Sequence, residues 1–371
     1  MSLSGWFPID KPLGLFGLAI SAASTVLLSL LVAVAAAVFN WASDGHYSEL
    51  VLSIGIALVL TIGFQIFSGS TGVVSFGHPA FVAIGAYVAG IVSVPPEMKS
   101  TMLPDLPASL GTLQLGLVPA TLLGGLVAAI LALLVGPVVM RLSGAAASIM
   151  TFGFLVIVNE LLRNAESFTR GNQTFFGVPK LASFGAVYGT VVLAAALAAT
   201  FKFSRAGLRV RAIREDSLAA ETAGIGAVAA RMWPWVLSAF VMGAGGALTA
   251  FFLTAFSPQS FYVPLAIPMI IMAVLGGLGS VAGAIAGTVV LTIWQQLMQL
   301  LETGGFGFSV PLGSSQLTLG LGLILLLYWR PSGLLADREF MLGGVDRAVT
   351  SHSPDPNFAS DRREGEAGNE I

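Results

Sequence analysis

Long apolar segments separated by short polar connections run along most of the chain. A helix needs about 20 apolar residues to cross the ~30 Å hydrocarbon layer of a membrane. Ten segments meet or approach this length, and we predict a membrane-spanning helix in each: 14–39, 50–67, 79–95, 115–140, 145–162, 184–201, 232–257, 263–278, 282–300 and 312–329. The glycine-rich stretch 276–279 could also join the eighth and ninth segments into one interrupted element. The pattern therefore predicts an all-α polytopic membrane protein with eight to ten transmembrane helices.

Charged residues avoid these segments. The ten segments hold 202 residues and a single charge, Glu160, whereas the other 169 residues hold 35 charges. Only 10% of the 371 residues are charged, against about 25% in a soluble protein, which excludes a soluble two-domain enzyme. The net charge of −2 offers no basic patch for nucleic acid. The chain has no cysteine, and its three histidines lie far apart in sequence, so we predict no disulfide and no metal site.

Lysine and arginine predict the orientation, because loops on the cytoplasmic side retain positive charge. With ten spans both termini share a side, and cytoplasmic termini place 13 of the 17 basic residues in the cytoplasm. Loop 163–183 carries three of the four exceptions. Beyond Met341 the sequence turns polar and charged. We therefore expect a transmembrane domain over 1–340, with a cytoplasmic segment at 204–231, and a disordered cytoplasmic tail over 341–371.

Small and polar residues crowd the segment 68–79, between the second and third apolar segments. Three glycines, three serines and a threonine fall within ten residues, which predicts irregular backbone that lines a cavity or is buried in protein at membrane depth. A cytoplasmic turn that allows close helix packing is the alternative. The candidates for a polar path here are Ser70, Thr71, Gly72, Ser75 and His78. A hydrolase that pairs His78 with a serine would lack an orienting acid within the spans, so we predict no catalytic residue.

A polar stripe is predicted on the fifth apolar segment. Ser148, Thr151, Asn159 and Arg163 share roughly one helical face, and such a face turns toward a partner or a pathway rather than toward lipid. The first three join the candidate path. Glu160 lies near the end of the segment, where we expect it to pair with Arg163 three positions on.

The stretch 204–225 predicts a short amphipathic helix on the cytoplasmic side. Ile213, Leu218 and Ala219 can form its apolar side and Arg211, Arg214 and Glu215 its charged side, while Gly224 would end it. Nine charges between 202 and 231 exceed what topology needs, which favours a docking surface for a cytoplasmic partner over an ordinary positive loop.

Two further patterns bear on function. Gly279, Gly283 and Gly287 repeat every four residues, the spacing at which helix backbones approach closely. Lysine never follows a Gly-x4-Gly pattern in this chain, so we expect no nucleotide-binding loop and no ATP hydrolysis by the chain itself.

Four stretches together carry a resemblance to a known family. They are Gly69–Phe81 with Gly85-Ala86-Tyr87, Ser204–Gly224, Val274–Gly283, and Arg330-Pro331-Ser332-Gly333-Leu334-Leu335. With them, the chain from about Leu50 to Leu335 resembles the LivM-type permease subunits of ABC importers for branched-chain amino acids, in the hydrophobic amino acid uptake family. The resemblance implies the permease fold of an ABC importer in the cell inner membrane.

The resemblance also implies the partners. They would be a second permease subunit (LivH-type), two ATP-binding subunits that hold the ATP, and a periplasmic substrate-binding protein, with no cofactor in this chain. The portion with Ala219, Ala220 and Gly224 looks like the helix that couples to the ATPase, and we assign Arg211, Arg214, Glu215 and Asp216 to the same coupling region. Leu218 stands where the general importer motif has glutamate.

The sequence leaves more than one substrate class open. In the external loop 168–179, Arg170 and Thr174 stand where the family usually has glycine, so a urea or small-acid permease of the same family is an alternative to an amino acid permease. An ion-coupled secondary transporter is the alternative from another class. It would need carboxylates at mid-membrane depth, and the spans offer only Glu160 near a boundary.

Overall fold

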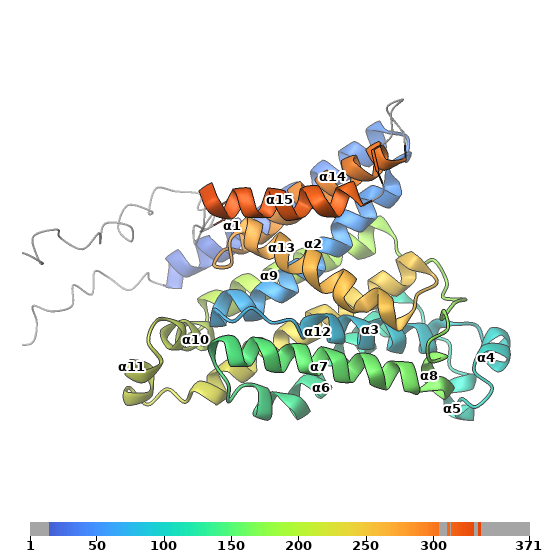
Figure 1. Cartoon of the computed structure of the whole chain (residues 1–371), viewed down its shortest axis with the longest axis horizontal. Helices are drawn as coiled ribbons and strands as arrows, with labels where there is room; N and C mark the ends of the chain where they lie inside the picture. Colours follow the sequence, from blue (N-terminus) through green and yellow to red (C-terminus); the bar gives the residue numbers. More distant parts are fainter. Residues whose placement is uncertain (1–14, 304–309, 312, 330–332, 335–371) are drawn as a thin grey trace, which may run out of the picture.

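Helices make up nearly all of the regular structure in this computed structural model, which describes residues 15–303, 310–311, 313–329 and 333–334 (Figure 1). Within these ranges the β-structure is one isolated antiparallel bridge between Phe175 and Phe256. The elements in chain order are α1 (Leu15–Ala42), α2 (Ser48–Thr71), α3 (His78–Ser93), α4 (Pro96–Met102), α5 (Ala108–Gly111), α6 (Leu117–Val139), α7 (Gly144–Asn164), α8 (Glu166–Thr169), α9 (Phe184–Phe203), α10 (Arg205–Glu215), α11 (Ser217–Thr222), α12 (Ala227–Leu253), the 3₁₀ helix η2 (Pro258–Phe261), α13 (Val263–Gly276), α14 (Val281–Glu302) and α15 (Ser314–Trp329). The predicted all-α class is confirmed.

A helix coincides with each of the ten predicted segments. Not every one of these helices is long enough to cross a membrane alone. In the described residues eight spans qualify by length and composition: most of α1, then α2, α6, α7, α9, α12, η2 with α13, and α14. The helices α3 and α4 form a ninth candidate, bent by 117° between them. The helix α15 has only 16 residues. The chain is therefore a multi-pass membrane protein within the predicted range.

The helix α12 lies at the centre and packs against α2, α3 and α6. Glycines bring these backbones together, because Gly85 of α3 and Gly124 of α6 both lie against Gly243 of α12. A Cβ on Gly85 would overlap the carbonyl oxygen of Gly243. Such contacts without side chains are how membrane helices pack closely.

The helices α13 and α14 form an antiparallel hairpin. Gly276 lies against Gly283, and Gly287 lies against the carbonyl of Met272, so the residues that pair run in opposite directions. The alternative of one interrupted span across 276–279 is therefore wrong. The predicted small-residue contact is present at Gly283 and Gly287, whereas Gly279 lies in the turn before α14.

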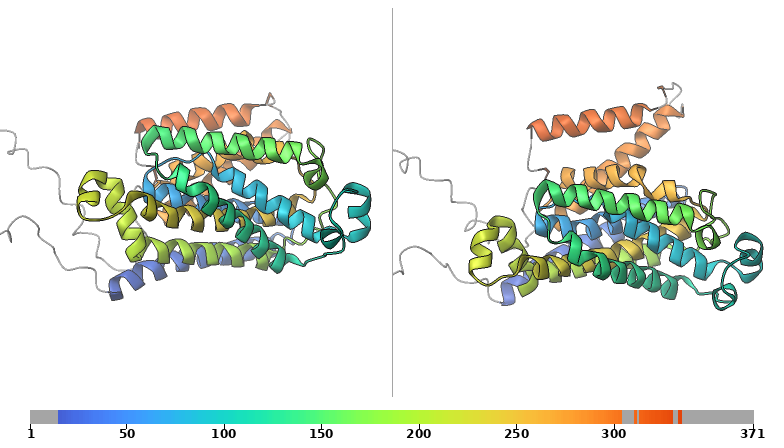
Figure 2. Two further views of the ribbon diagram at one scale, coloured as in Figure 1. Left: turned by 90° about the horizontal axis from the view of Figure 1, so that it is seen from below. Right: turned by 60° about the horizontal axis from the view of Figure 1, so that its bottom comes forward.

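Small helices gather at the two ends of the bundle, as both views in Figure 2 also show. The helices α10 and α11 lie at one end and α4, α5 and α8 at the other (Figure 1). Loop 163–183 belongs to the α4–α5 end. The predicted tail 341–371 lies outside the described residues.

Candidate functional site

The backbone between α2 and α3 is non-helical over 72–77, as the small polar residues predict. The helix α2 ends at Gly72, which adopts φ +72°, a conformation that is unfavourable for residues with a side chain. The N–H of Gly72 donates to Ser68 O at 3.0 Å. The chain stays non-helical to Gly77 before α3 begins at His78. Val73, Ser75 and Gly77 are buried and Val74 and Phe76 are half-buried, whereas Gly72 is exposed, so protein covers this irregular segment except at its first residue.

The polar stripe of α7 supplies partners for that segment. Ser148 Oγ donates to Val74 O at 2.7 Å, and Phe76 N–H donates to Thr151 Oγ1 at 3.2 Å. Further along the stripe, Asn159 Nδ2 donates to Pro258 O at 3.0 Å. The polar stripe of α7 therefore faces protein rather than lipid, as expected. The irregular backbone of 72–77 lacks the hydrogen bonds of a helix, and the stripe supplies some of them. Whether these side chains line a transport path stays a prediction.

His78 is buried in an aromatic cage. Its ring centroid lies 5.3 Å from those of Phe64, Phe67 and Trp235 and 5.9 Å from that of Phe81. In the described part of the chain neither ring nitrogen has a hydrogen-bond partner. A serine nucleophile would need a hydrogen bond to this imidazole, so the hydrolase alternative finds no support. Its place in the path, like those of Ser70, Thr71, Gly72 and Ser75, stays a prediction.

The predicted amphipathic helix is two helices, not one. Asp216 separates them in an extended conformation, and its carboxylate accepts the N–H groups of Leu218 and Ala219 at 2.9 and 3.0 Å, which caps α11. The break interrupts the helical periodicity. Ile213, before the break, is buried as expected. Leu218 and Ala219, after the break, are exposed and do not share a buried apolar side with Ile213.

Arg211 and Arg214 of α10 also depart from the predicted charged side. Both are half-buried and turn toward the bundle. Arg211 Nη2 donates to Lys202 O at 3.0 Å, and Arg214 Nη1 donates to Gly69 O at 2.9 Å. Glu215 and Asp216 are exposed.

The end of α11 follows the prediction. Gly224 adopts φ +81°, and the N–H of Ile225 bonds back to Ala220 O at 3.0 Å, which terminates the helix. Ala220 is buried, whereas Gly224 is exposed.

The turn between α13 and α14 is held by two side chains that the sequence did not single out. Gln65 Nε2 of α2 donates to the carbonyls of Gly277, at 3.2 Å, and of Leu278. Lys202 Nζ of α9 donates to Gly279 O at 2.5 Å. Gln65 could have been singled out in the sequence, because it is a long polar side chain inside an apolar segment.

The four stretches that carried the resemblance thus meet at the α10–α11 end. Arg214 joins the second stretch to Gly69 of the first, and Gly69 lies against the carbonyl of Leu278 in the third. From the fourth, Leu334 N–H donates to Leu275 O at 2.8 Å. Segments as far apart in sequence as Gly69 and Leu334 therefore form one contiguous region.

Comparison with known proteins identifies the family. The family of branched-chain amino acid transport system permease components matches residues 46–327. The chain belongs to this family. Its curated relatives include the high-affinity branched-chain amino acid transport system permease proteins LivM of Salmonella typhimurium strain LT2 and Escherichia coli strain K12. Each is 26% identical over 314 residues, covering 76% of this chain and 68% of the relative. No solved structure matched the chain.

Membership confirms the resemblance drawn from the sequence, including the expectation of an ABC-importer permease subunit. The protein is a component of a multi-subunit transport system, and its family is one of permeases rather than of catalysts. Helix α1 precedes the part of the permease that the family match covers.

The α4–α5 end of the permease carries its own polar network. The predicted pair is present, with Arg163 Nη1 at 3.1 Å from Glu160 Oε1, and both side chains are largely exposed. Arg163 Nε also donates to Asn172 Oδ1 at 2.6 Å. Arg170, at φ +63°, donates to Thr174 O at 2.6 Å. The two positions that depart from the family's glycines therefore contact each other.

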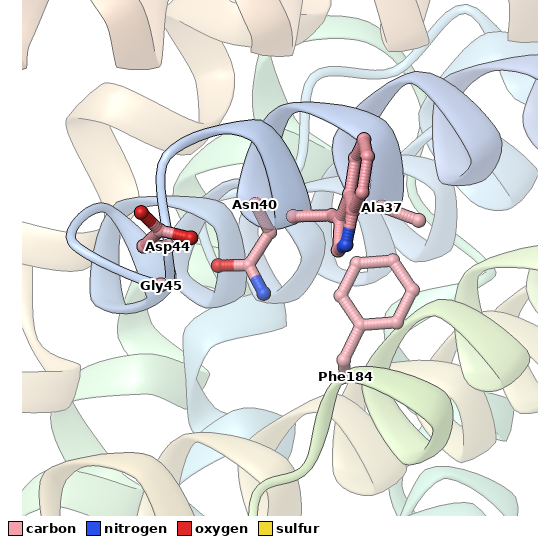
Figure 3. Close-up of a pocket in the computed structure, with 6 residues that line it drawn as sticks. Ala37, Asn40, Asp44, Gly45 and Phe184 are labelled. Carbon is pink, nitrogen blue, oxygen red and sulfur yellow. The ribbon is translucent and has the colours of Figure 1, made fainter.

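A shallow pocket of about 430 Å³ lies where α1, the turn after it and the start of α9 meet. Figure 3 shows Asn40 and Asp44 on one side of it and the ring of Phe184 on the other. Asp44 and Gly45 both have positive φ and form the tight turn to α2. The pocket is open and none of its lining residues belongs to the four meeting stretches, so we assign it no role.

Proposed function

We propose that this permease translocates branched-chain or other hydrophobic amino acids across the cell inner membrane, with both termini in the cytoplasm. It would work with a second permease subunit of the LivH type, two ATP-binding subunits and a periplasmic substrate-binding protein. ATP would bind to the partner subunits and not to this chain. The names of the LivM relatives support the substrate class.

The observation that carries the coupling to ATP is the projecting pair α10–α11. Leu218 lies in the first turn of α11 and is 73% exposed, beside the exposed Ala219. Leu218 lies outside the candidate membrane spans, so lipid does not account for its exposure. We infer that a partner subunit covers it, because this is the portion of the sequence that resembles a coupling helix. Small neighbours leave room for a partner surface to close over it.

The distribution of basic side chains supports the orientation. Of the eleven lysines and arginines in the described residues, seven lie at the α10–α11 end: Arg141, Lys202, Arg205, Arg209, Arg211, Arg214 and Arg231. The other four lie at the α4–α5 end. Since cytoplasmic loops retain positive charge, the α10–α11 end would face the cytoplasm, where the ATPase subunits would be.

Leu218→Asp is expected to remove the ATPase subunits from the purified complex, because it places a charge in the proposed apolar contact. The measurement is the amount of ATPase that co-purifies with the tagged permease. Leu181→Asp, the same change at an exposed leucine of the opposite end, serves as the control and should leave the ATPase bound. Equal co-purification in the two variants would contradict this docking site.

Glu160→Gln is expected to leave uptake unchanged, because an exposed ion pair contributes only about 0–1 kcal/mol and Glu160 lies at the end of α7. Glu215→Lys is expected to abolish uptake, because it reverses a charge at the exposed end of α10. An ion-coupled transporter predicts the opposite order of effects, since Glu160 is the charge that its spans offer.

The decisive test of the whole proposal is reconstitution. The tagged permease is purified with its genomic neighbours, placed in liposomes, and assayed with leucine, urea and a panel of amino acids. Uptake that needs both ATP and a binding protein would support the importer, and the accepted substrate would separate the amino acid from the urea or small-acid alternative. Transport by this chain alone, insensitive to ATP, would instead identify a secondary transporter.

A further inference from the structure

The end of α2 is held from outside by a side chain of α10. In a continuous helix Gly69 O would accept the N–H of Val73. Here α2 has already ended, and Val73 N–H donates to Thr71 Oγ1 at 3.3 Å instead. The carbonyl of Gly69 accepts Arg214 Nη1 at 2.9 Å. The guanidinium thus supplies the hydrogen-bond donor that the next turn of the helix would have provided to Gly69 O.

Gly72 makes room for this arginine. A Cβ on Gly72 would lie 3.1 to 3.3 Å from Arg214 Cγ, Cδ and Nε, tighter than ordinary van der Waals contact. The positive φ of Gly72 already disfavours a side chain there. The arginine therefore contacts the first residue of the 72–77 segment with its aliphatic stem and the last turn of α2 with its charged end.

The rest of α10 is anchored so that Arg214 moves with it. Val210 and Ile213 are buried against the bundle, and Arg211 donates to Lys202 O in the last turn of α9. On the opposite side Arg209 and Glu215 are exposed. A displacement of the α10–α11 pair would consequently be applied to Gly69 and Gly72 through Arg214.

The 72–77 segment can respond to such a displacement. On its far side it is held by Ser148 and Thr151 of α7 through single hydrogen bonds. It leads directly into His78 and the aromatic cage around it, which includes Trp235. The start of α3 therefore lies within a few residues of the arginine contact.

We propose that Arg214 is a positioning residue that transmits movement of the α10–α11 segment to the 72–77 segment during transport. This inference rests on the proposed function, because it takes α10–α11 to be the part that engages the ATPase. In this role Arg214 acts through the backbone of Gly69 rather than on ATP or substrate. Its effect requires that the contact with Gly69 differ between the two states of the cycle, since an interaction equal in both shifts no equilibrium.

The test uses the complete complex in liposomes and compares Arg214→Ala with Arg209→Ala, an exposed arginine on the same helix. Arg214→Ala should keep the ATPase bound and hydrolysing ATP, while uptake per ATP hydrolysed falls by about tenfold, a typical size for a lost coupling between sites. Arg214→Lys should recover part of the loss, because it retains a charged donor without the fork of the guanidinium. Arg209→Ala should keep the wild-type ratio.

A second readout separates transmission from a general structural role. The chain has no cysteine, so Val74→Cys introduces a single thiol into the 72–77 segment. Its alkylation rate should change by about fivefold or more when ATP is bound and hydrolysis is trapped. In the Arg214→Ala background the rate should no longer respond. If Arg214→Ala fails to assemble, Arg214→Gln, which keeps most of the length and loses the charge, replaces it in both assays.

The outcomes are distinct. Unchanged uptake per ATP in the Arg214 variant, or a thiol that still responds to ATP, would overturn the role of Arg214 while leaving the importer intact. A wild-type complex that shows no ATP-driven uptake would overturn the proposed function itself.

Discussion

Gly85→Ala is expected to prevent accumulation of the folded permease, whereas Gly189→Ala is tolerated. The added methyl group on α3 would overlap the backbone of Gly243 in α12, and neither backbone can move without disturbing α6, which contacts both. Overpacking costs about 1–3 kcal/mol where a side chain can adjust, and a collision with backbone lies at or above the upper end of that range. Gly189 is exposed on α9 with open space around it, so alanine there can only favour the helix.

The measurement is the yield of monodisperse protein after extraction in detergent, with both variants expressed in parallel. We expect aggregated or degraded protein for Gly85→Ala and wild-type behaviour for Gly189→Ala. A monodisperse Gly85→Ala variant at normal yield would mean that α3 and α12 do not approach as closely as described.

Trp235→Ala is expected to lower the free energy of unfolding by about 3–5 kcal/mol, the usual cost of removing a large buried aromatic side chain. Trp235 is fully buried, and its Nε1 donates to Ala132 O at 3.1 Å. Its ring lies 5.0 Å from that of Phe81 and 5.3 Å from that of His78. The substitution therefore leaves a cavity where α2, α3 and α12 meet and removes one hydrogen bond to α6.

Trp233, two positions earlier on the same helix, provides the matched control because it is 68% exposed. Thermal unfolding of the purified permease in detergent, followed by loss of monodisperse protein, compares the two variants. Trp233→Ala should change the midpoint little and Trp235→Ala should lower it strongly. Similar midpoints would show that the aromatic cage contributes little to stability.

Local patterns in the sequence predicted local structure well. Apolar length and the absence of charge identified a helix in every predicted segment, because the membrane imposes both requirements on each span separately. The pair of Glu160 and Arg163 follows from their spacing on one helix, and the end of α11 at Gly224 follows from glycine's access to positive φ.

Contacts between distant segments were not predictable in the same way. The bond from Arg214 to Gly69 joins residues 145 positions apart, and nothing in either local pattern indicates the other. The sequence shows that Gly243 is a glycine in an apolar segment. It does not show that Gly243 lies against Gly85 and Gly124, because those contacts depend on how three helices cross. The break at Asp216 depended on one carboxylate that caps α11 instead of continuing α10.

The irregular backbone at 72–77 has a kinetic consequence. A regular helix changes shape only by breaking several hydrogen bonds of its own ladder together, whereas this segment is held by separate bonds from Ser148 and Thr151 that can exchange one at a time. A change of shape in this segment therefore requires fewer bonds to break at once than a change in a helix of the same length. Amide hydrogen exchange should accordingly be faster at Val74 and Phe76 than in the middle of either helix.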